Sequence, residues 1–277
     1  MLNISIVLYR PAWEREVIPL VKELLHIKNL RKIYLLDNTE PSYSPQDGPT
    51  AQAVLQQSGL TAKPSKVRYM PMTANLGYGK AHNIAIRESV FYRTDYHLVI
   101  NSDIRVKAEQ IEEMAAWMDA YPEVGQLMPR VVSEDGTPQY LAKRLPSPWD
   151  VAARRFIPGW QNTRRNKWYE LRDKDLTHPI NAPYLSGCFM LLRTQAVLEA
   201  GLFDERYFMY PEDIDLTRSI HRQWLTIYQP QWTIVHAHKR ASYHSTRMLW
   251  IHIQNLCRYF NKYGWFFDKE RWRMNKV

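Results

Sequence analysis

The chain has few cysteines, few glycines and no long apolar segment. Its 277 residues include only two cysteines and ten glycines. Two cysteines are too few for a disulfide framework or a zinc knuckle, so a reducing cytoplasm is the expected setting. No apolar run reaches the ~18 residues of a membrane-spanning helix. No basic leader precedes the apolar start of the chain, so we expect no signal peptide.

Large aromatic residues and positive charge are abundant instead. The chain has ten tryptophans, 17 tyrosines, a formal net charge of +9 and 45% hydrophobic residues. This length and balance fit a large α/β domain with a proper core. The charge predicts an anionic partner, which would be nucleic acid, an anionic membrane face or a phosphate-bearing substrate. The aromatic surplus indicates surfaces that contact ring-shaped ligands or a membrane boundary.

Short β-branched runs alternate with helix-like stretches along the first half of the chain. The expected strands cover residues 3–9, 32–37, 67–70 and 96–100, and the expected helices cover 18–30, 50–57, 77–91 and 108–121. The regularity fades after residues 124–129. This alternation predicts βαβ units and a mostly parallel sheet flanked by helices. Farther on we expect a strand at 188–193, helices at 194–200 and 216–225, a late strand ending in histidines, and a long amphipathic stretch at 245–263. We predict a catalytic domain over residues 1–244 and a helical tail over 245–277.

Polar residues follow the ends of three expected strands. The first strand ends at Tyr9, the second at Asp37, and the fourth at Asn101, Ser102 and Asp103. In an open α/β sheet, ligands bind beyond the carboxyl ends of the strands, so these side chains would share one crevice. Each Asp could simply begin a turn, but two at one sheet edge favour a binding site.

Two further segments carry ligand-binding residue types. Gly77 and Lys80 open a helix after the third strand, where glycine lets backbone approach a ligand and helix-start amides with a lysine favour phosphate. The segment matches neither the P-loop nor the dinucleotide fingerprint. His236 and His238 lie two apart in a late strand and so point the same way. Such a pair is often a surface feature, but with Asp103 it would form a site for Mg²⁺ or Mn²⁺.

The segment 201–218 gathers acidic side chains in a basic protein. Glu212, Asp213 and Asp215 follow Pro211 and precede an apolar-periodic run. Unpaired amide groups and the helix dipole favour negative charge at such a helix start. The carboxylates are therefore either helix caps or part of a reactive site.

Taken in order, these blocks resemble family 2 glycosyltransferases of the GT-A fold, in the bacterial polysaccharide-assembly branch. The resemblance covers about residues 2–245, and the tail looks like the end of rhamnosyltransferase-type members that build O-antigen or capsule repeats. The matching blocks are S-I-V-L-Y, L-L-D-N, N-L-G-Y-G-K-A-H-N, V-I-N-S-D, Y-L-S-G-C-F-M-L-L-R and G-L-F-D-E-R-Y-F-M-Y-P-E-D-I-D-L.

The resemblance implies a role for each motif. Asp37 would contact the base of a nucleotide-sugar, and the nucleotide would be bordered by Tyr9, Asn75, Gly77, Lys80, Asn101 and Ser102. Asp103 would bind Mn²⁺ or Mg²⁺, with His236 or His238 completing the shell. Asn101 stands where the family often has an Asp, which leaves a less charged metal site. Asp213 would be the catalytic base, supported by Glu212.

The implied activity is an inverting, metal-dependent sugar transfer. The donor would be dTDP-rhamnose or a UDP-hexose, and the acceptor a hydroxyl of a polyprenyl-diphosphate-linked glycan. A divalent cation stabilises the charge that grows on the diphosphate leaving group. A single base on the opposite face implies direct displacement with inversion. Nucleic acid is not an expected partner, since no reading motif occurs. The rival interpretation is a basic, non-enzymatic protein that binds nucleic acid or a membrane surface.

Two basic or aromatic regions remain open to two interpretations each. Leu249, Ile253, Leu256 and Phe260 share a helical face, which either packs on the domain or lies in a membrane interface. In the second case Trp265, Phe266, Phe267 and Trp272 would lie at headgroup level, and the protein would be cytoplasmic and peripheral on an anionic membrane. The basic insertion 130–165 would contact the acceptor or form a solvated surface.

Overall fold

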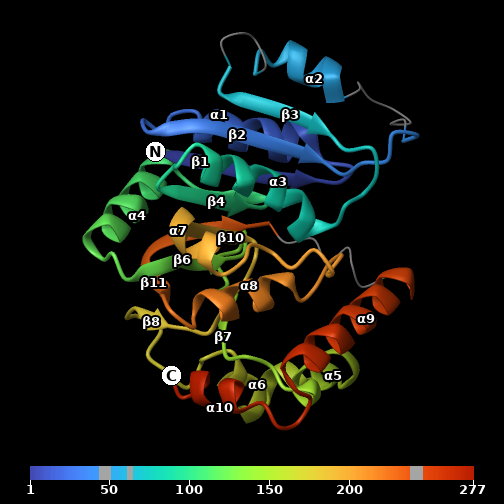
Figure 1. Ribbon diagram of the computed structural model, residues 1–277, viewed down its shortest axis with the longest axis vertical. Coiled ribbons are helices and arrows are strands. Elements are labelled where there is room, and N and C mark those ends of the chain that lie inside the picture. Colours follow the sequence, from blue (N-terminus) through green and yellow to red (C-terminus); the bar gives the residue numbers. More distant parts are fainter. Residues whose placement is uncertain (44–50, 61–64, 238–245) are drawn as a thin grey trace.

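The computed structural model describes residues 1–43, 51–60, 65–237 and 246–277. A central sheet has the strand order β3-β2-β1-β4-β10-β6-β11-β5, with β8 paired to β11 (Figure 1). The strands are β1 Leu2–Leu8, β2 Leu30–Asp37, β3 Val67–Pro71, β4 Tyr96–Ile100, β5 Ile104–Arg105, β6 Val124–Val132, β8 Ile180–Asn181, β10 Phe189–Arg193 and β11 Leu225–His236. A separate ribbon pairs β7 (Ala142–Lys143) with β9 (Tyr184–Leu185).

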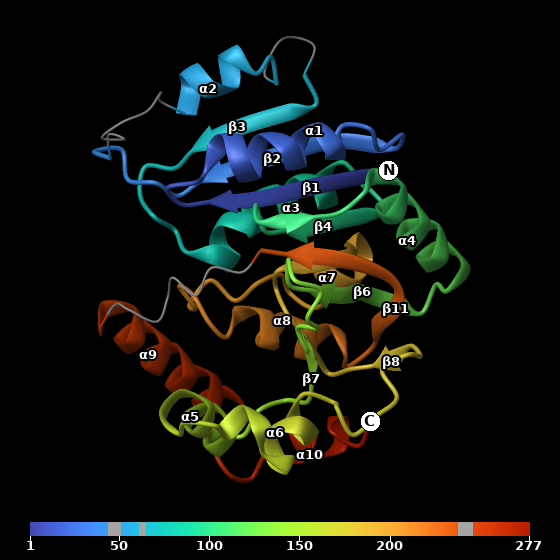
Figure 2. The same cartoon turned by 180° about the vertical axis from the view of Figure 1, so that it is seen from behind.

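Helices cover both faces of the sheet, as the α/β fold class requires. Figure 2 shows α1 against the face that lies at the back in Figure 1. There α1 and α4 pack with Ile4 and Ile6 of β1 in one apolar cluster. On the other face, α3, α7 and α8 pack with Val99 of β4 and Met190 of β10. The described helices are α1 Ile18–Leu24, α2 Ala51–Gln57, α3 Tyr78–Phe91, α4 Ala108–Ala120, α5 Pro148–Phe156, α6 Arg164–Tyr169, α7 Thr194–Glu199, α8 Glu212–Ile220, α9 Thr246–Tyr263 and α10 Lys269–Met274.

The sheet is mixed, and most of its strands run in one direction, as expected. Strands β3, β2, β1 and β4 run parallel, as expected, and β6 is parallel to β11. Strand β10 is antiparallel to both β4 and β6, and β5 and β8 are antiparallel to β11. A buried apolar run has the same pattern in either direction, so its periodicity could not indicate the reversal.

The helix expected at 216–225 ends earlier than its apolar pattern suggested. Helix α8 spans Glu212–Ile220, and Leu225 already begins β11. Leu225, the last apolar residue of the 216–225 run, pairs with Val124 of β6 and therefore belongs to a strand and not to the helix. The carboxylates at the start of the helix are where the sequence predicted them.

The basic insertion is folded and internally paired. Arg144 is 2% exposed and makes a bidentate contact with Asp173, at 2.7 and 2.9 Å. Arg154 contacts Glu170 at 2.8 Å, and the Arg165 guanidinium contacts Asp150 at 2.7 Å. These arginines are therefore neither a simple solvated surface nor available as free cations.

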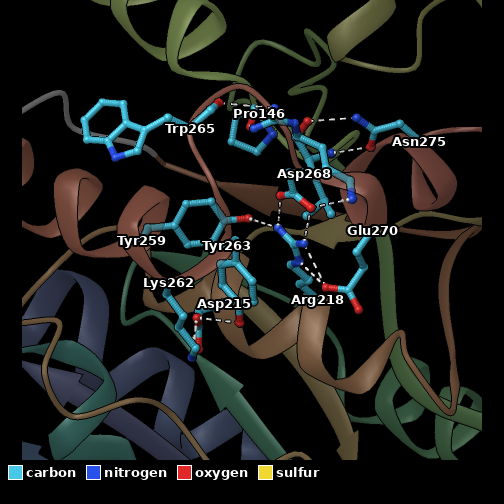
Figure 3. A network of polar contacts seen from close by, with 12 residues as sticks. Pro146, Asp215, Arg218, Tyr259, Lys262, Tyr263, Trp265, Asp268, Glu270 and Asn275 are labelled. Carbon is cyan, nitrogen blue, oxygen red and sulfur yellow. Dashed lines mark hydrogen bonds and ion pairs between the residues drawn. The ribbon is translucent and has the colours of Figure 1, made fainter.

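The C-terminal helices are tied to α8. Arg218 of α8 is 1% exposed, and its guanidinium donates two 2.7 Å hydrogen bonds to Asp268 (Figure 3). It also contacts Glu270 at 2.8 Å. One turn earlier, Asp215 accepts hydrogen bonds from Lys262 at 2.8 and 2.9 Å. Lys262 holds the end of α9, and Asp268 and Glu270 hold the start of α10, so the C-terminal helices pack on the domain through Asp215 and Arg218 of the acidic segment.

Candidate active site

Asp213 lies at the start of α8 with its carboxylate held by three donors. Oδ2 accepts from the Gly187 amide at 3.0 Å and from the Tyr184 hydroxyl at 3.2 Å. Oδ1 accepts from the Ile214 amide at 2.8 Å. Hydrogen bonds to a carboxylate favour its ionised form. Asp213 is half-buried, so burial opposes them and raises its pKa.

Glu212 is placed differently, although it is the next residue. It is 5% exposed, and its Oε2 has no hydrogen-bond partner among the described residues. Burial, and then the charge of Asp213, raise the pKa of Glu212 to about 8. Two adjacent carboxyls cannot both ionise easily in a buried site, and the donors around Asp213 decide which one does. The geometry leaves Glu212 neutral near pH 7 and Asp213 charged.

A short chain of contacts joins Asp213 to the end of β4. The Tyr78 hydroxyl lies 2.6 Å from the Gly187 carbonyl and 3.0 Å from Asn101 Oδ1. Gly187 in turn donates to Asp213. A Cβ on Gly187 would lie 3.1 Å from the Asp213 Cβ, so the residue has little room for a side chain. A hydroxyl has one proton and both of these oxygens accept, so Tyr78 donates to the closer Gly187 carbonyl and Asn101 lies beside it. The base region and the end of β4 are therefore neighbours in one site.

Asp103 and His236 face each other at the edge where β5 meets β11. Asp103 Oδ1 lies 3.4 Å from His236 Nε2, and His236 pairs in register with Ile104. The cavity beside them measures about 840 Å³ and is also lined by Ser102. That volume is typical of small-molecule sites, which span about 300–1,000 Å³.

Gln139 determines which nitrogen of His236 faces Asp103. Its amide nitrogen donates to the His236 carbonyl at 2.8 Å, and a carbonyl can only accept. Gln139 Oε1 must therefore be the atom 2.9 Å from His236 Nδ1, which carries the proton. The lone pair of Nε2 is then directed toward Asp103. A ligand imidazole is commonly oriented this way by a partner on its other nitrogen.

The Asp103 and His236 donor set fits a divalent cation with oxygen and nitrogen ligands. Within the part of the chain that the structure describes, no group of three or more His, Cys, Asp or Glu side chains gathers around a common point. A cation bound here would therefore take its remaining ligands from substrate or water. His238, the rival ligand in the sequence analysis, lies outside the described residues.

The predicted nucleotide side is built around Asp37. This residue is 4% exposed, and its carboxylate accepts from the Tyr69 hydroxyl at 2.8 Å and from the Thr39 amide at 2.9 Å. Next to it, the Asn38 side chain donates to the Gly77 carbonyl at 3.0 Å. Asn75 accepts from the Gly77 amide at 3.0 Å. The end of β2 and the 75–77 loop thus lie side by side.

Three other predicted residues have contacts that the sequence did not indicate. A Cβ on Gly77 would lie 2.1 Å from the Phe208 carbonyl oxygen, so the close approach allowed by this glycine is to protein backbone. The Lys80 ammonium lies 3.9 Å from the Glu205 carboxylate. Tyr9 is 48% exposed and donates to Glu40 at 2.8 Å. Their contacts with a nucleotide remain predictions.

Sequence reasoning missed four residues of the site. Tyr78, Tyr184 and Gly187 lie within blocks that carried the resemblance, but nothing in their spacing indicated that they converge on Asp213. Gln139 lies in the basic insertion and gave no signal, since its role depends on the chain folding back beside β6, which brings its side chain to His236 of β11.

Solved structures with the same fold confirm the GT-A architecture. The chain aligns over 94% of its length with GalNAc-T7 bound to UDP, GalNAc and Mn²⁺, at 14% identity and a TM-score of 0.65, covering 47% of that chain. A mannosyltransferase from Pyrobaculum calidifontis with GDP-Man and Mn²⁺ aligns over the same share, at 15% identity and a TM-score of 0.54, covering 63% of that chain. At this identity the likeness shows the fold alone.

Sequence relatives identify the family. An N-acetylglucosaminyl-diphospho-decaprenol L-rhamnosyltransferase of Mycobacterium tuberculosis is 32% identical over 188 residues, which are 64% of this chain and 60% of the relative. A low-salt glycan biosynthesis hexosyltransferase, Agl10 of Haloferax volcanii, is 24% identical over 60% of this chain and 50% of its own. The chain thus spans about half to three fifths of these relatives. The sequence model of Glycosyl transferase family 2 matches residues 21–200, and the chain belongs to that family.

Proposed function

We propose that this glycosyltransferase moves a sugar, with inversion, from a nucleotide diphosphate sugar to a hydroxyl of a lipid-linked glycan acceptor. The observation that carries the proposal is the chain of short contacts from Asp213 through Gly187 and Tyr78 to Asn101. This path connects a carboxylate to the strand end that bears Asp103. The donor is dTDP-rhamnose or a UDP-hexose, the first being favoured by the name of the mycobacterial relative.

Asp213 acts as the base in this proposal. Its carboxylate takes the proton of the acceptor hydroxyl as that oxygen attacks the anomeric carbon from the side opposite the leaving diphosphate. The Gly187 amide and the Tyr184 hydroxyl hold the carboxylate in place while the acceptor binds. Glu212, neutral beside it, adds no competing charge.

Asp103 and His236, oriented by Gln139, would hold Mn²⁺ or Mg²⁺ at the donor diphosphate. The cation supplies charge stabilisation for the departing nucleotide diphosphate. Asp37 and Asn75 would bind the nucleoside. Mn²⁺ in two structures of the same fold supports this kind of cofactor.

The experiment that tests the function combines donor binding with transfer. Nucleotide diphosphates and nucleotide-sugars are screened by thermal shift with and without Mn²⁺, since ligands of the native state raise Tm. Asp213→Asn should keep the donor-induced shift and lose transfer by about 10²–10⁴-fold. Full turnover by this variant would remove Asp213 as the base, and no shift with any nucleotide would contradict a transferase.

We also propose that the segment around helix α10 contacts the cytoplasmic face of an anionic membrane. No helix in the described ranges is both long and apolar enough to cross a bilayer. The support is instead an aromatic rim, defined as the exposed residues Trp149, Trp265, Phe266, Phe267 and Trp272. Arg271 holds the backbone of the rim in place, because its guanidinium donates hydrogen bonds to the carbonyls of Pro146, Trp265 and Phe266. Exposed Lys269 and Arg273 lie on the adjoining helix α10.

A further inference from the structure

Lys143 lies close to the proposed base and makes no ion pair with a described residue. It ends β7, where it pairs in register with Tyr184 of β9. Its ammonium lies 5.4 Å from the centre of the Tyr184 ring and 5.9 Å from that of Tyr169. The Tyr184 hydroxyl donates to Asp213. One aromatic ring therefore separates this cation from the carboxylate that we propose as the base.

Three other basic residues of the insertion are neutralised by carboxylates. Arg144, Arg154 and Arg165 each have a carboxylate partner at 2.7–2.8 Å. No described residue offers the Lys143 ammonium a hydrogen-bond or ion-pair partner within bonding distance, and only the two rings contact it. Lys143 therefore differs from these three arginines in having no bonded carboxylate in the described part of the chain, and it lies beside the site.

The surroundings of Lys143 favour an anionic ligand. The side chain is half-buried, and the Arg154 guanidinium lies 5.3 Å from the centre of the same Tyr169 ring. Burial first, and then the charge of Arg154, lower the pKa of Lys143 to about 8. Two cations flanking one ring repel each other in a poorly solvated place, and a bound anion would relieve both costs.

We propose that Lys143 binds a phosphate oxygen of the acceptor, whose reacting sugar carries a diphosphate on its anomeric carbon. This proposal rests on the proposed function. The donor diphosphate belongs at Asp103, so an anionic group near Asp213 must come from the other substrate. In a sugar 1-diphosphate, the phosphate and a ring hydroxyl lie at opposite sides of one pyranose. Lys143 and Asp213, separated by one ring, match that arrangement. An ammonium suits phosphate as a compact point charge.

Two acceptors that differ only in the anionic group test the proposal. The probes are an N-acetylglucosaminyl diphosphate carrying a short prenyl chain, and octyl N-acetylglucosaminide, which lacks the diphosphate. Lys143→Met should raise KM for the diphosphate acceptor at least tenfold and change KM for the octyl glycoside less than twofold. Lys143→Arg keeps the charge and should recover most of the difference. Lys167→Met, which changes an exposed lysine of α6, is the matched control.

The alternative is that Lys143 only keeps Asp213 ionised. In that case Lys143→Met would lower kcat equally with both acceptors and leave the KM ratio unchanged, which would overturn the phosphate site. Nucleotide-sugar binding by each variant is measured in parallel and shows that the variant is folded. Absence of that binding in the wild type would refute the proposed function. Donor binding with no discrimination between the acceptors would refute the Lys143 site alone.

Discussion

At the scale of single residues, the two neighbouring carboxyls 212 and 213 differ because of their donors. Asp213 has three hydrogen-bond donors, whereas Glu212 has a buried oxygen without one among the described residues. The sequence could place both at a helix start. It could not separate their roles, because the amide of Gly187 and the hydroxyl of Tyr184 come from a distant strand segment.

Glu212→Gln should preserve activity, since the amide has the shape of the neutral acid. We expect transfer within about tenfold of the wild type at pH 7. The free energy of unfolding should respond to pH. The folded-state pKa of about 8 exceeds the ordinary 4.5, so the folded state keeps a proton that the unfolded chain has released. Wild-type stability therefore falls as pH rises from about 4.5 to 8.

The variant lacks this loss, so its Tm advantage over the wild type should grow across that pH interval. Thermal unfolding from pH 5 to pH 8 measures the trend, and the exposed Glu109→Gln serves as control. A constant difference in Tm across the interval would show that Glu212 ionises normally.

Gln139→Leu should weaken metal binding without removing a ligand. Loss of the acceptor on His236 Nδ1 frees the imidazole to rotate or to change tautomer, which costs about 10–100-fold in metal affinity. Titration of Mn²⁺ followed by electron paramagnetic resonance measures the affinity directly. Gln110→Leu is matched, because Gln110 also donates to a β11 carbonyl, that of Thr233 at 3.1 Å. Equal Mn²⁺ affinity in the two variants would exclude an orienting role for Gln139.

At the scale of elements, the hydrophobic periodicity of the sequence predicted where helices and strands lie. It did not predict which strands pair or in which direction. Strands β1, β2, β3 and β4, and helix α3, lie within two residues of their expected bounds. Short elements of the insertion such as α5, α6, β7 and β9 were not predicted, because their stability comes from ion pairs and contacts with α10. Arg144 illustrates this, since its partners are Asp173 and the Asn275 carbonyl.

The loop that contains Gly77 contacts the loop that contains Phe208, and the energetic cost of disturbing this contact can be predicted. Gly77 and Gly136 have nearly the same backbone angle, φ +80° and +81°. A Cβ at Gly136 meets nothing within 4 Å, whereas one at Gly77 meets the Phe208 backbone at 2.1 Å. Gly136→Ala should therefore cost only backbone strain, about 1–3 kcal/mol.

Gly77→Ala adds a backbone clash and should cost about 4 kcal/mol or more in the free energy of unfolding. Urea unfolding of the two variants compares the costs. Equal values would mean that the 208 loop moves aside freely, and the contact between the two loops would then carry no energetic weight.

At the scale of the whole molecule, the family resemblance predicted the architecture of the domain. It did not predict how the C-terminal tail is attached, which only the structure shows. The sequence left open whether residues 245–263 pack on the domain or lie in a membrane interface. Phe260 is buried in a cluster with Tyr207 and Ile214, yet the aromatic rim on the adjoining loop is exposed. The C-terminal segment therefore both packs on the domain and exposes aromatic side chains, so its hydrophobic pattern alone could not distinguish the two interpretations.

The aromatic rim predicts binding to anionic vesicles that weakens with salt. Phe266 and Phe267 are 72% and 86% exposed, so replacing both with Ser should lower partitioning about tenfold or more. Phe91→Ser is the control, because Phe91 is 77% exposed on α3, far from the rim. Co-sedimentation with vesicles measures the effect. Equal partitioning onto neutral and anionic vesicles would argue against the membrane surface.

The clamp between Arg218 and Asp268 also has a consequence for biosynthesis. The two residues are 50 positions apart, so the guanidinium leaves the ribosome well before its partner. Until translation has passed the aspartate, the arginine has to stay hydrated, and the helix that begins with Glu212 and Asp213 lacks its final anchor. The nascent enzyme therefore anchors the helix that carries its proposed base late, after the central sheet has already been synthesised.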